Sequence, residues 1–526
     1  MKLPKAAYDW ALKHLMTEGD TDLFPRPFEL DAIKHNWSDI VKLLESQEVQ
    51  EYEWHVGRRF IVPKDNLAFR TATQLDPVDS ILLAALMYKF GKKIEKRRIS
   101  ISEKTVFSYR FCPTKDGRLY GDNSGWKDFW NTSISKAKAS TTNFVLVTDI
   151  SDFYNQIYHH VLENQLAECL PVQVASSLRR FLTTLTHTVS RGIPVGPHSV
   201  HLLAEAALIP IDESLRSTGH DFCRYVDDIH IFAGTREEAQ IRLYDLVHIL
   251  DEQQRLVLQK HKTKIVSAQE FILTAEAQLS DRPINKEEDA LLKAISKRSN
   301  NSPYQRVSLE SFTPDEKNLL TQDVLEDLLR MYLSPSEPNF VRIGWLLRRL
   351  AQVGAPGAID FVLNHIDQMI PVTGEIARYI LSSSPNYKGN FKDAGAKLIR
   401  AIERPLALHS EYLLAILIDL FAKVPSMNHI SSITKLYPSS TPLIRREIIL
   451  AAAAAKSNSW LRGKKSDFSN GDPWLRRAIL YASSQFPGDE ADHWIKAVKP
   501  TFTGPEKLVV RWRMGKSQKL GDLKLK

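Results

Sequence analysis

The sequence predicts an α+β domain followed by an all-α helical-repeat domain. Within residues 100–270, apolar runs of strand length alternate with long segments of helical period. After about residue 285 the strand signals nearly vanish. Helical segments then recur at 31-residue spacing, starting near Glu411, Pro442 and Pro473. A fixed period of this size is typical of stacked helix pairs, and an irregular helical bundle is the alternative.

Residues 1–60 are predicted to be mainly helical, and a further helix is expected after them. Apolar residues at helical spacing from Trp10 to Met16 indicate one helix, and a second is expected from about Glu29 to Gln47. Residues 58–62 have the pattern of a short strand. Asp76-Pro77 begins another helix, because proline is favoured at the first helical position, and this helix is expected to reach about Lys93.

These patterns divide the chain into four parts. We expect N-terminal helices over residues 1–55, the α+β domain over 56–285, a helical connector over 286–335 and the helical-repeat domain over 336–526.

The composition is that of a folded protein with a basic balance of charge. Lys and Arg number 70 against 62 Asp and Glu, a net charge of +8, and a basic balance favours nucleic acid. The basic stretch Lys507–Lys526 is either a solvated tail or a nucleic-acid contact. The longest apolar runs reach eight residues, far short of the ~20 that span a membrane. Three cysteines without metal-ligand spacing fit a reducing compartment, so we expect a cytoplasmic protein.

Two segments carry aspartates at the ends of apolar strands. The run 144–147 leads directly into Asp149, and Asp227 and Asp228 lie between two apolar stretches, as at a hairpin tip. Adjacent carboxylates among hydrophobic residues are costly unless a cation compensates them. Nucleotidyl transfer uses two divalent ions ~3.5–4 Å apart, and Mg²⁺ prefers carboxylate oxygens. Together the two segments predict a metal-dependent nucleotidyl-transfer site.

The two segments resemble motifs A and C of reverse transcriptases. Tyr225-Val226-Asp227-Asp228 has the family's Tyr-x-Asp-Asp form in full. Residues 191–197 resemble motif B, and residues 256–265 resemble motif D. Upstream, the segments that resemble the fingers motifs are Lys64 with Arg70, residues 76–81 and residues 108–111. Order and spacing agree across residues 55–270, which implies a fingers–palm fold for the α+β domain.

The resemblance implies a role for each matching residue. Asp149, Asp227 and Asp228 would hold Mg²⁺, or Mn²⁺ as an alternative, with the backbone carbonyl of Ile150. Tyr154 would lie against the sugar C2′ and exclude a 2′-hydroxyl, and a core tyrosine is the alternative. The positions expected to contact the nucleotide are Lys64, Arg70, Tyr154, Arg191, Gly192, Pro194 and Lys262.

Several further assignments complete the site, and some leave alternatives open. Lys262 is the candidate proton donor to pyrophosphate, although Lys260 and Lys264 lie close to it. Lys64 and Arg70 could instead be surface charges. Tyr225 would support the primer end. Asp152, a second acid in motif A, is interpreted as a helix cap or a surface residue.

Departures from the family pattern narrow the resemblance. The usual glutamine of motif B is Arg191, and the usual serine is Gly196. This motif, the opening segment 19–29 and the helical C-terminal half are similar to abortive-infection (Abi) and unknown-group antiphage reverse transcriptases. The resemblance implies a defence enzyme that uses dNTPs and forms a homo-oligomer, either a trimer or a hexamer. It would copy a noncoding RNA, or make DNA without a template from a protein primer.

Two other functions compete with this one. A catalytically inactive palm could act as a nucleic-acid-binding scaffold, but the intact aspartates argue against it. An RNA-directed RNA polymerase is disfavoured by Tyr154 and by the Tyr-x-Asp-Asp context.

Overall fold

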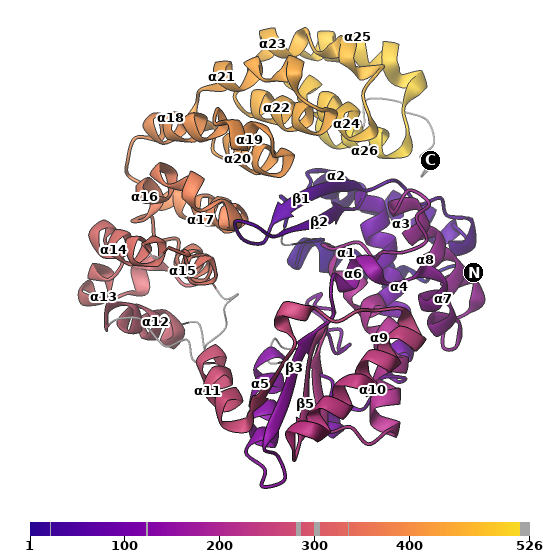
Figure 1. The fold of residues 1–526 in the computed structure, drawn as a ribbon. Coiled ribbons are helices and arrows are strands. Elements are labelled where there is room, and N and C mark those ends of the chain that lie inside the picture. Colours follow the sequence, from indigo (N-terminus) through magenta and orange to yellow (C-terminus); the bar gives the residue numbers. More distant parts are fainter. Residues whose placement is uncertain (22, 122–124, 280–285, 299–305, 335, 516–526) are drawn as a thin grey trace. The chain divides into compact units, whose positions relative to one another are not determined.

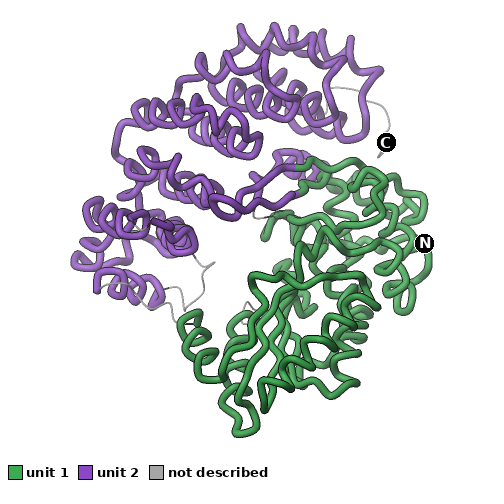
Figure 2. Tube along the Cα trace, in the orientation of Figure 1, with its two compact units in different colours: residues 1–21, 37–59, 73–282 green, residues 22–36, 60–72, 283–526 purple. Residues whose placement is uncertain are grey.

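The computed structural model describes residues 1–21, 23–121, 125–279, 286–298, 306–334 and 336–515. The chain forms two compact units, each drawn from separate stretches (Figure 2). Unit 1 comprises residues 1–21, 37–59 and 73–282, and unit 2 comprises residues 22–36, 60–72 and 283–526. The predicted four-part division stays a prediction. Its boundaries at residues 285 and 335, and residues 516–526 of the basic tail, lie outside the described residues.

A four-stranded antiparallel sheet is the centre of unit 1, with strand order β4-β5-β3-β6. Its strands are β3 (Phe144–Asp149), β4 (Phe222–Tyr225), β5 (Asp228–Ala233) and β6 (Lys264–Ser267). Alternate residues of a strand point to opposite faces. Val145 and Phe232 therefore share one face, and Leu146 and Ile231 share the other. Both pairs are buried, so the sheet is covered on both sides.

Helices cover this sheet. Helices α5 and α11 pack on each other and on the sheet, and α10 packs against β3 and β5 from the other side (Figure 1). The helices of unit 1 are α1 (Lys5–Thr17), α3 (Trp37–Ser46), α4 (Pro77–Glu95), α5 (Gly125–Ala137), α6 (Phe153–Gln156), α7 (His159–Ala167), α8 (Val172–Leu185), α9 (His201–Ser217), α10 (Arg236–Gln254) and α11 (Ala268–Leu279). Among the described residues, no helix combines the length and apolar character needed to cross a membrane.

Two local expectations about the N-terminal helices have different outcomes. Helix α4 begins as predicted, with Pro77 at its first position and Asp76 accepting a hydrogen bond from the Val78 backbone N–H. The single helix expected from Glu29 to Gln47 is wrong, because the chain forms α2 (Glu29–His35) and α3, which belong to different units. Asn36 lies in the turn between the two helices. Its side-chain amide donates to the carbonyls of Ala32 and Leu508.

Unit 2 is built mainly from stacked helices. Helices α15, α17, α20, α22, α24 and α26 form a row in which each packs against the next. Its helices are α2, α12 (Lys286–Arg298), α13 (Pro314–Asn318), α14 (Gln322–Leu333), α15 (Phe340–Val353), α16 (Ile359–Asn364), α17 (Thr373–Ser383), α18 (Phe391–Ile402), α19 (Pro405–Leu408), α20 (Glu411–Lys423), α21 (Ile430–Lys435), α22 (Pro442–Ala454), α23 (Asn458–Arg462), α24 (Pro473–Ser483), α25 (Gly488–Val498) and α26 (Gly504–Met514).

The 31-residue spacing corresponds to real helix starts. Helices α20, α22 and α24 begin at Glu411, Pro442 and Pro473, as predicted, and α26 begins one further step along at Gly504. Asp472 caps α24 by accepting from the Leu475 backbone N–H at 2.7 Å. The HEAT-like character of these repeats stays a prediction.

A hairpin joins strands β1 (Arg58–Pro63) and β2 (Phe69–Gln74), and its outer part, residues 60–72, belongs to unit 2. Phe60 on this hairpin packs on Phe24 with ring centroids 4.4 Å apart, and Phe24 in turn contacts Tyr412 of α20. Aromatic packing thus anchors the hairpin to the stacked helices.

A buried ion cluster ties α2 to the C-terminal helices. Glu29 accepts hydrogen bonds from Arg446 of α22 at 2.8 Å and from Arg477 of α24 at 3.2 Å. All three residues are nearly inaccessible to solvent. Arg446 and Arg477 occupy equivalent positions in successive 31-residue repeats, so one carboxylate bridges two repeats.

Glu29→Ala should therefore destabilise unit 2 by about 3 kcal/mol, the usual cost of leaving a buried charge without its partner. The variant removes the carboxylate that both Arg446 and Arg477 bind. Thermal unfolding, with hydrogen exchange of the α22 and α24 peptides, measures the effect. Glu403→Ala removes an exposed acid from the same unit and serves as the control. Equal stability of the two variants would contradict the structural role of Glu29.

Candidate active site

The sheet of unit 1 brings the three candidate aspartates together. Asp149 ends β3 and lies opposite Asp228, the first residue of β5, in the antiparallel register. The backbone N–H of Ile150 donates to the carbonyl of Asp227 at 3.0 Å, which joins the β4–β5 turn to the end of β3. Asp149 is buried, whereas Asp227 and Asp228 are half-buried. Strand pairing thus places all three carboxylates at one end of the sheet.

The turn itself has an unusual backbone. Val226 lies in the left-handed region with φ of 56°, which a β-branched residue rarely adopts. Its N–H donates to Ser108 Oγ at 2.9 Å, and its carbonyl accepts from Arg224 Nη1 at 2.9 Å. Both backbone polar groups of Val226 are therefore held by side chains, which fixes the direction of the two aspartates that follow.

Arg224 belongs to a fully buried network of charges behind the turn. Its guanidinium pairs with Asp212 through Nε at 2.7 Å and Nη2 at 2.6 Å, and with Glu205 at 2.9 Å. Arg98 also donates to Glu205 at 2.7 Å, and the Ser108 hydroxyl donates to the same carboxylate. Although burial raises the pKa of Glu205, the charges of Arg224 and Arg98 lower it below its usual value. Glu205 therefore remains charged and pairs with both arginines.

The sequence patterns considered above did not predict this network, although the spacing of its two acids is a signal for it. Glu205 and Asp212 are seven residues apart, and thus on one face of the largely apolar helix α9. Two acids on a buried helix face require buried cations. The sequence does not reveal that Arg98 and Arg224 are those cations, because neither lies on the same helix.

The electrostatics of the site disfavour three ionised carboxylates. Burial, and then the charges of Asp227 and Asp149, raise the pKa of Asp228 to about 7. Lys262 Nζ lies 2.6 Å from Asp149 Oδ2. Although burial lowers the pKa of Lys262, its hydrogen bond with Asp149 and the charges of all three aspartates raise it above its usual value. The ammonium group therefore stays protonated and partly compensates the cluster.

The donor set fits a divalent metal by its chemistry. Three carboxylates that interact through their charges are hard oxygen ligands for which a cation would relieve the repulsion. Over the part of the chain that the structure describes, no group of three or more His, Cys, Asp or Glu side chains already has metal-binding geometry. In this arrangement the Lys262 ammonium group pairs with Asp149. Ile150 directly follows Asp149 and is buried.

The loop that resembles motif B lies beside α6. The backbone N–H of Ile193 donates to the Tyr154 carbonyl at 2.7 Å, and that of Gly192 donates to the Ile157 carbonyl at 2.8 Å. Gly192 and Pro194 are buried, whereas Arg191 is exposed and donates to Gln156 at 3.2 Å. Arg191 is thus the loop residue whose charge faces solvent.

Asp152 lies at the N-cap position of α6 and is exposed, with φ of 47°. Its side chain caps no backbone N–H and instead accepts a hydrogen bond from Asn155 at 2.7 Å. The residue lies in the motif A segment without belonging to the carboxylate cluster.

The two fingers candidates lie in the other unit. Lys64 and Arg70 are on the β1–β2 hairpin within residues 60–72 of unit 2, whereas the carboxylates belong to unit 1. Lys64 is exposed at the turn, and its backbone N–H donates to the Ala68 carbonyl at 2.8 Å. Arg70 is half-buried. Their proposed contact with the triphosphate stays a prediction.

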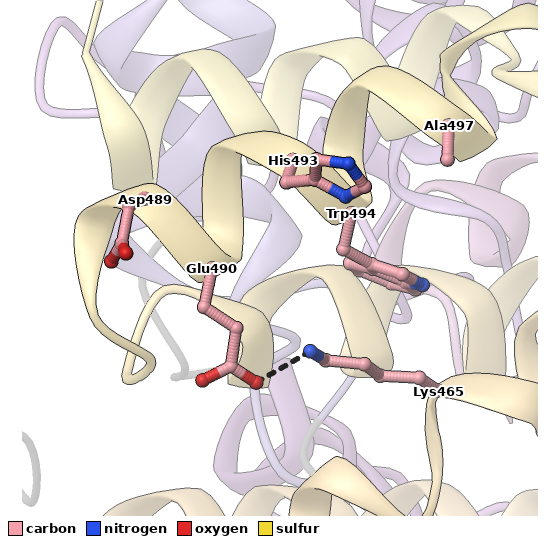
Figure 3. Close-up of a pocket in the computed structure, with 6 residues that line it drawn as sticks. All are labelled: Lys465, Asp489, Glu490, His493, Trp494 and Ala497. Carbon is pink, nitrogen blue, oxygen red and sulfur yellow. Dashed lines mark hydrogen bonds and ion pairs between the residues drawn. The ribbon is translucent and has the colours of Figure 1, made fainter.

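A pocket of about 530 Å³ in unit 2 offers a different kind of cavity (Figure 3). Lys465 Nζ and Glu490 pair across it at 2.6 Å, and Arg462 also binds Glu490. None of the candidate residues above belongs to its lining, which consists of Lys465, Asp489, Glu490, His493, Trp494 and Ala497. Of the two acids in this lining, Glu490 is paired with two bases, Lys465 and Arg462.

Comparison with known proteins identifies the domain that contains the cluster. Residues 81–292 match the family model described as "Reverse transcriptase (RNA-dependent DNA polymerase)". No curated protein matches the chain.

Solved structures of two telomerases have weak similarity. The apo telomerase of Candida tropicalis is 11% identical, with a TM-score of 0.32 over 77% of this chain and 73% of that chain. The telomerase of Candida albicans with a telomeric RNA fragment is 12% identical, with a TM-score of 0.29 over 79% and 71%. The family match, which spans all three aspartates, is what identifies the enzyme. Residues 81–292 are therefore a reverse-transcriptase domain, and the chain is an RNA-directed DNA polymerase.

Proposed function

We propose that Asp149, Asp227 and Asp228 catalyse the addition of deoxynucleotides to a nucleic-acid or protein primer. The observation that carries this proposal is the register of β3 and β5, which sets Asp149 opposite Asp228 with Asp227 adjacent. The three carboxylates would hold Mg²⁺, or Mn²⁺ in its place. When bound, two such ions activate the attacking hydroxyl and stabilise the leaving oxygen.

The other residues of the site have complementary roles in this proposal. Lys262, whose ammonium group pairs with Asp149, would protonate the leaving pyrophosphate. Tyr225 supports the primer end, and Tyr154 excludes the 2′-hydroxyl of ribonucleotides. Arg191 supplies an exposed positive charge next to Gly192 and Pro194 for the triphosphate, a guide RNA or a protein. Lys64 and Arg70 bind the triphosphate from the β1–β2 hairpin.

The biological role we propose is antiphage defence in the cytoplasm. Its support is the resemblance of residues 191–197, with Arg191 and Gly196, to abortive-infection and unknown-group enzymes. The product would be a copy of a noncoding RNA, or untemplated DNA attached to a protein primer. The stacked helices of unit 2 would bind that RNA, the product or further subunits of a trimer or hexamer, because such stacks present extended binding surfaces.

The central experiment is to purify the protein with its copurified nucleic acid and to supply each dNTP with Mg²⁺. Digestion of the labelled product with DNase, RNase or protease then identifies the product, the template and any covalent link to protein. Omission of RNA separates templated from untemplated synthesis. Absence of incorporation by the wild type would refute catalysis and favour the scaffold, and incorporation of rNTPs in place of dNTPs would favour an RNA polymerase.

Asp149→Asn and Asp227→Asn should each lower dNTP incorporation by about 1000-fold. Metal charge stabilisation is worth several kcal/mol, and each tenfold loss corresponds to ~1.4 kcal/mol. Asp228→Asn should cost less, because the resemblance assigns the main burden of metal binding to Asp149 and Asp227. Initial rates with saturating Mg²⁺ provide the measurement. Asp152→Asn removes the same charge from an exposed position of the motif A segment and should leave the rate within about twofold. Normal activity of Asp227→Asn would refute the assignment.

Tyr154→Val should raise the ratio of ribonucleotide to deoxynucleotide incorporation by about 10–100-fold, the range that one pocket contact contributes to specificity. The smaller side chain would leave room for the 2′-hydroxyl. The ratio of kcat/KM for rNTP and dNTP tests this directly. Tyr244→Val, on the exposed face of α10, is the matched control. Unchanged sugar discrimination in Tyr154→Val would exclude the steric role.

Cells that express the wild-type protein should resist at least one phage by more than about tenfold in plating efficiency, whereas cells that express Asp227→Asn at the same level should not. The variant replaces a carboxylate of the site by a neutral amide. Loss of protection in this variant would therefore show that resistance depends on catalysis. Asp152→Asn is again the control. Equal protection by wild type and Asp227→Asn would separate any defence role from polymerisation.

A further inference from the structure

The candidate sugar-discriminating residue has a specific side-chain partner. The Tyr154 hydroxyl lies 2.7 Å from Nδ1 of His201, the first residue of α9. The two rings meet edge to face, with centroids 5.9 Å apart. The hydroxyl group of Tyr154 is therefore held by a hydrogen bond, in addition to the packing of its ring.

His201 is itself fixed by aromatic stacking. The ring of Tyr109 lies parallel to it, with centroids 3.9 Å apart and an interplanar angle of 2°. Tyr120 packs on Tyr109 at 5.1 Å, and its hydroxyl donates to the His198 carbonyl at 2.7 Å and accepts from the Leu202 N–H at 3.2 Å. The imidazole therefore cannot turn without disturbing the start of α9.

This aromatic cluster is connected to the buried charges behind the catalytic turn. The Tyr109 carbonyl accepts from Arg98 Nη1 at 3.0 Å, and Arg98 also pairs with Glu205. Tyr109 has φ of 43°, a strained conformation that its surroundings must hold. His201 is thus connected, through Tyr109, Arg98 and Glu205, to the buried charges that hold the turn before Asp227 and Asp228.

The hydrogen bond joins two neutral groups. Burial, and then the charge of His198, lower the pKa of His201 to about 3, and burial raises the pKa of Tyr154 well above its usual value. Either the hydroxyl or the ring N–H can donate, according to the imidazole tautomer. The contact therefore orients the phenol without creating a charge near the incoming nucleotide.

We propose that His201 is a positioning residue for sugar discrimination, which holds the Tyr154 ring against C2′ of an incoming deoxynucleoside triphosphate. A tyrosine side chain has three staggered χ1 orientations, and an unanchored ring can leave the position in which it excludes a 2′-hydroxyl. The hydrogen bond to His201 selects one orientation. This inference rests on the proposed polymerase function and on Tyr154 as the discriminating residue.

The test compares His201→Ala, His201→Gln and Tyr154→Phe by kcat/KM for rNTP and for dNTP. His201→Ala should raise the rNTP-to-dNTP ratio by about tenfold, the effect expected for loss of one hydrogen bond. Tyr154→Phe keeps the ring but loses the hydroxyl, and it should raise the ratio by a similar factor. His201→Gln keeps a side chain that can hydrogen-bond the phenol, and it should restore most of the discrimination.

The Tyr154→Val background distinguishes positioning from a general structural effect. Without the phenol, His201→Ala should change the ratio no further, although it can still lower both rates. An equal increase of the ratio in both backgrounds would overturn the proposal, as would an unchanged ratio in His201→Ala and Tyr154→Phe. Failure of the wild type to incorporate dNTPs would refute the polymerase function itself, and unchanged discrimination in Tyr154→Val would refute the role of Tyr154 independently of His201.

Discussion

The buried ion pairs of Arg224 are the interaction on which the carboxylate end of the sheet depends. A guanidinium removed from water is costly unless acids compensate it, and Glu205 and Asp212 of α9 supply them. The same guanidinium donates to the Val226 carbonyl. One side chain therefore both links α9 to β4 and sets the conformation of the turn that carries Asp227 and Asp228.

This coupling explains how the fold can sustain a locally unfavourable site. Val226 has a left-handed backbone, and burial with neighbouring charge raises the pKa of Asp228 to about 7. Strained and repulsive features persist only where the surroundings over-determine them. Here Ser108 and Arg224 bind both polar groups of the Val226 backbone, and the β3–β5 register fixes Asp149 opposite Asp228. The scaffold, rather than the carboxylates, provides the stabilising energy.

Local sequence patterns predicted the strands and helix starts that depend on residues close together in the chain. The apolar runs beside Asp149 and Asp228 form β3 and β5, and the Pro442 and Pro473 helix starts lie where the repeat places them. The pairing of distant charges was not predictable, since Glu29 binds Arg446 from a position 417 residues away. Nothing in a single sequence states which of many arginines compensates one buried glutamate. The break at Asn36 was missed for the same reason, because one acceptor of its amide is the distant Leu508 carbonyl.

The glycine that stands in place of the usual serine of motif B follows from packing. Gly196 has φ of 131°, and a Cβ there would lie 2.9 Å from the Thr73 carbonyl oxygen, so the serine of the family pattern does not fit. The loop lies against β2, because the backbone N–H of Thr73 donates to the Val195 carbonyl at 2.7 Å. It also meets the opening segment, since His198 donates to the Asp20 carbonyl at 2.9 Å. Two features that carry the resemblance to antiphage enzymes, the Gly19–Thr21 stretch and the altered motif B, are therefore in direct contact. A side chain at position 196 would press on both Thr73 and Thr21, so the glycine belongs to the same packing arrangement as the opening segment.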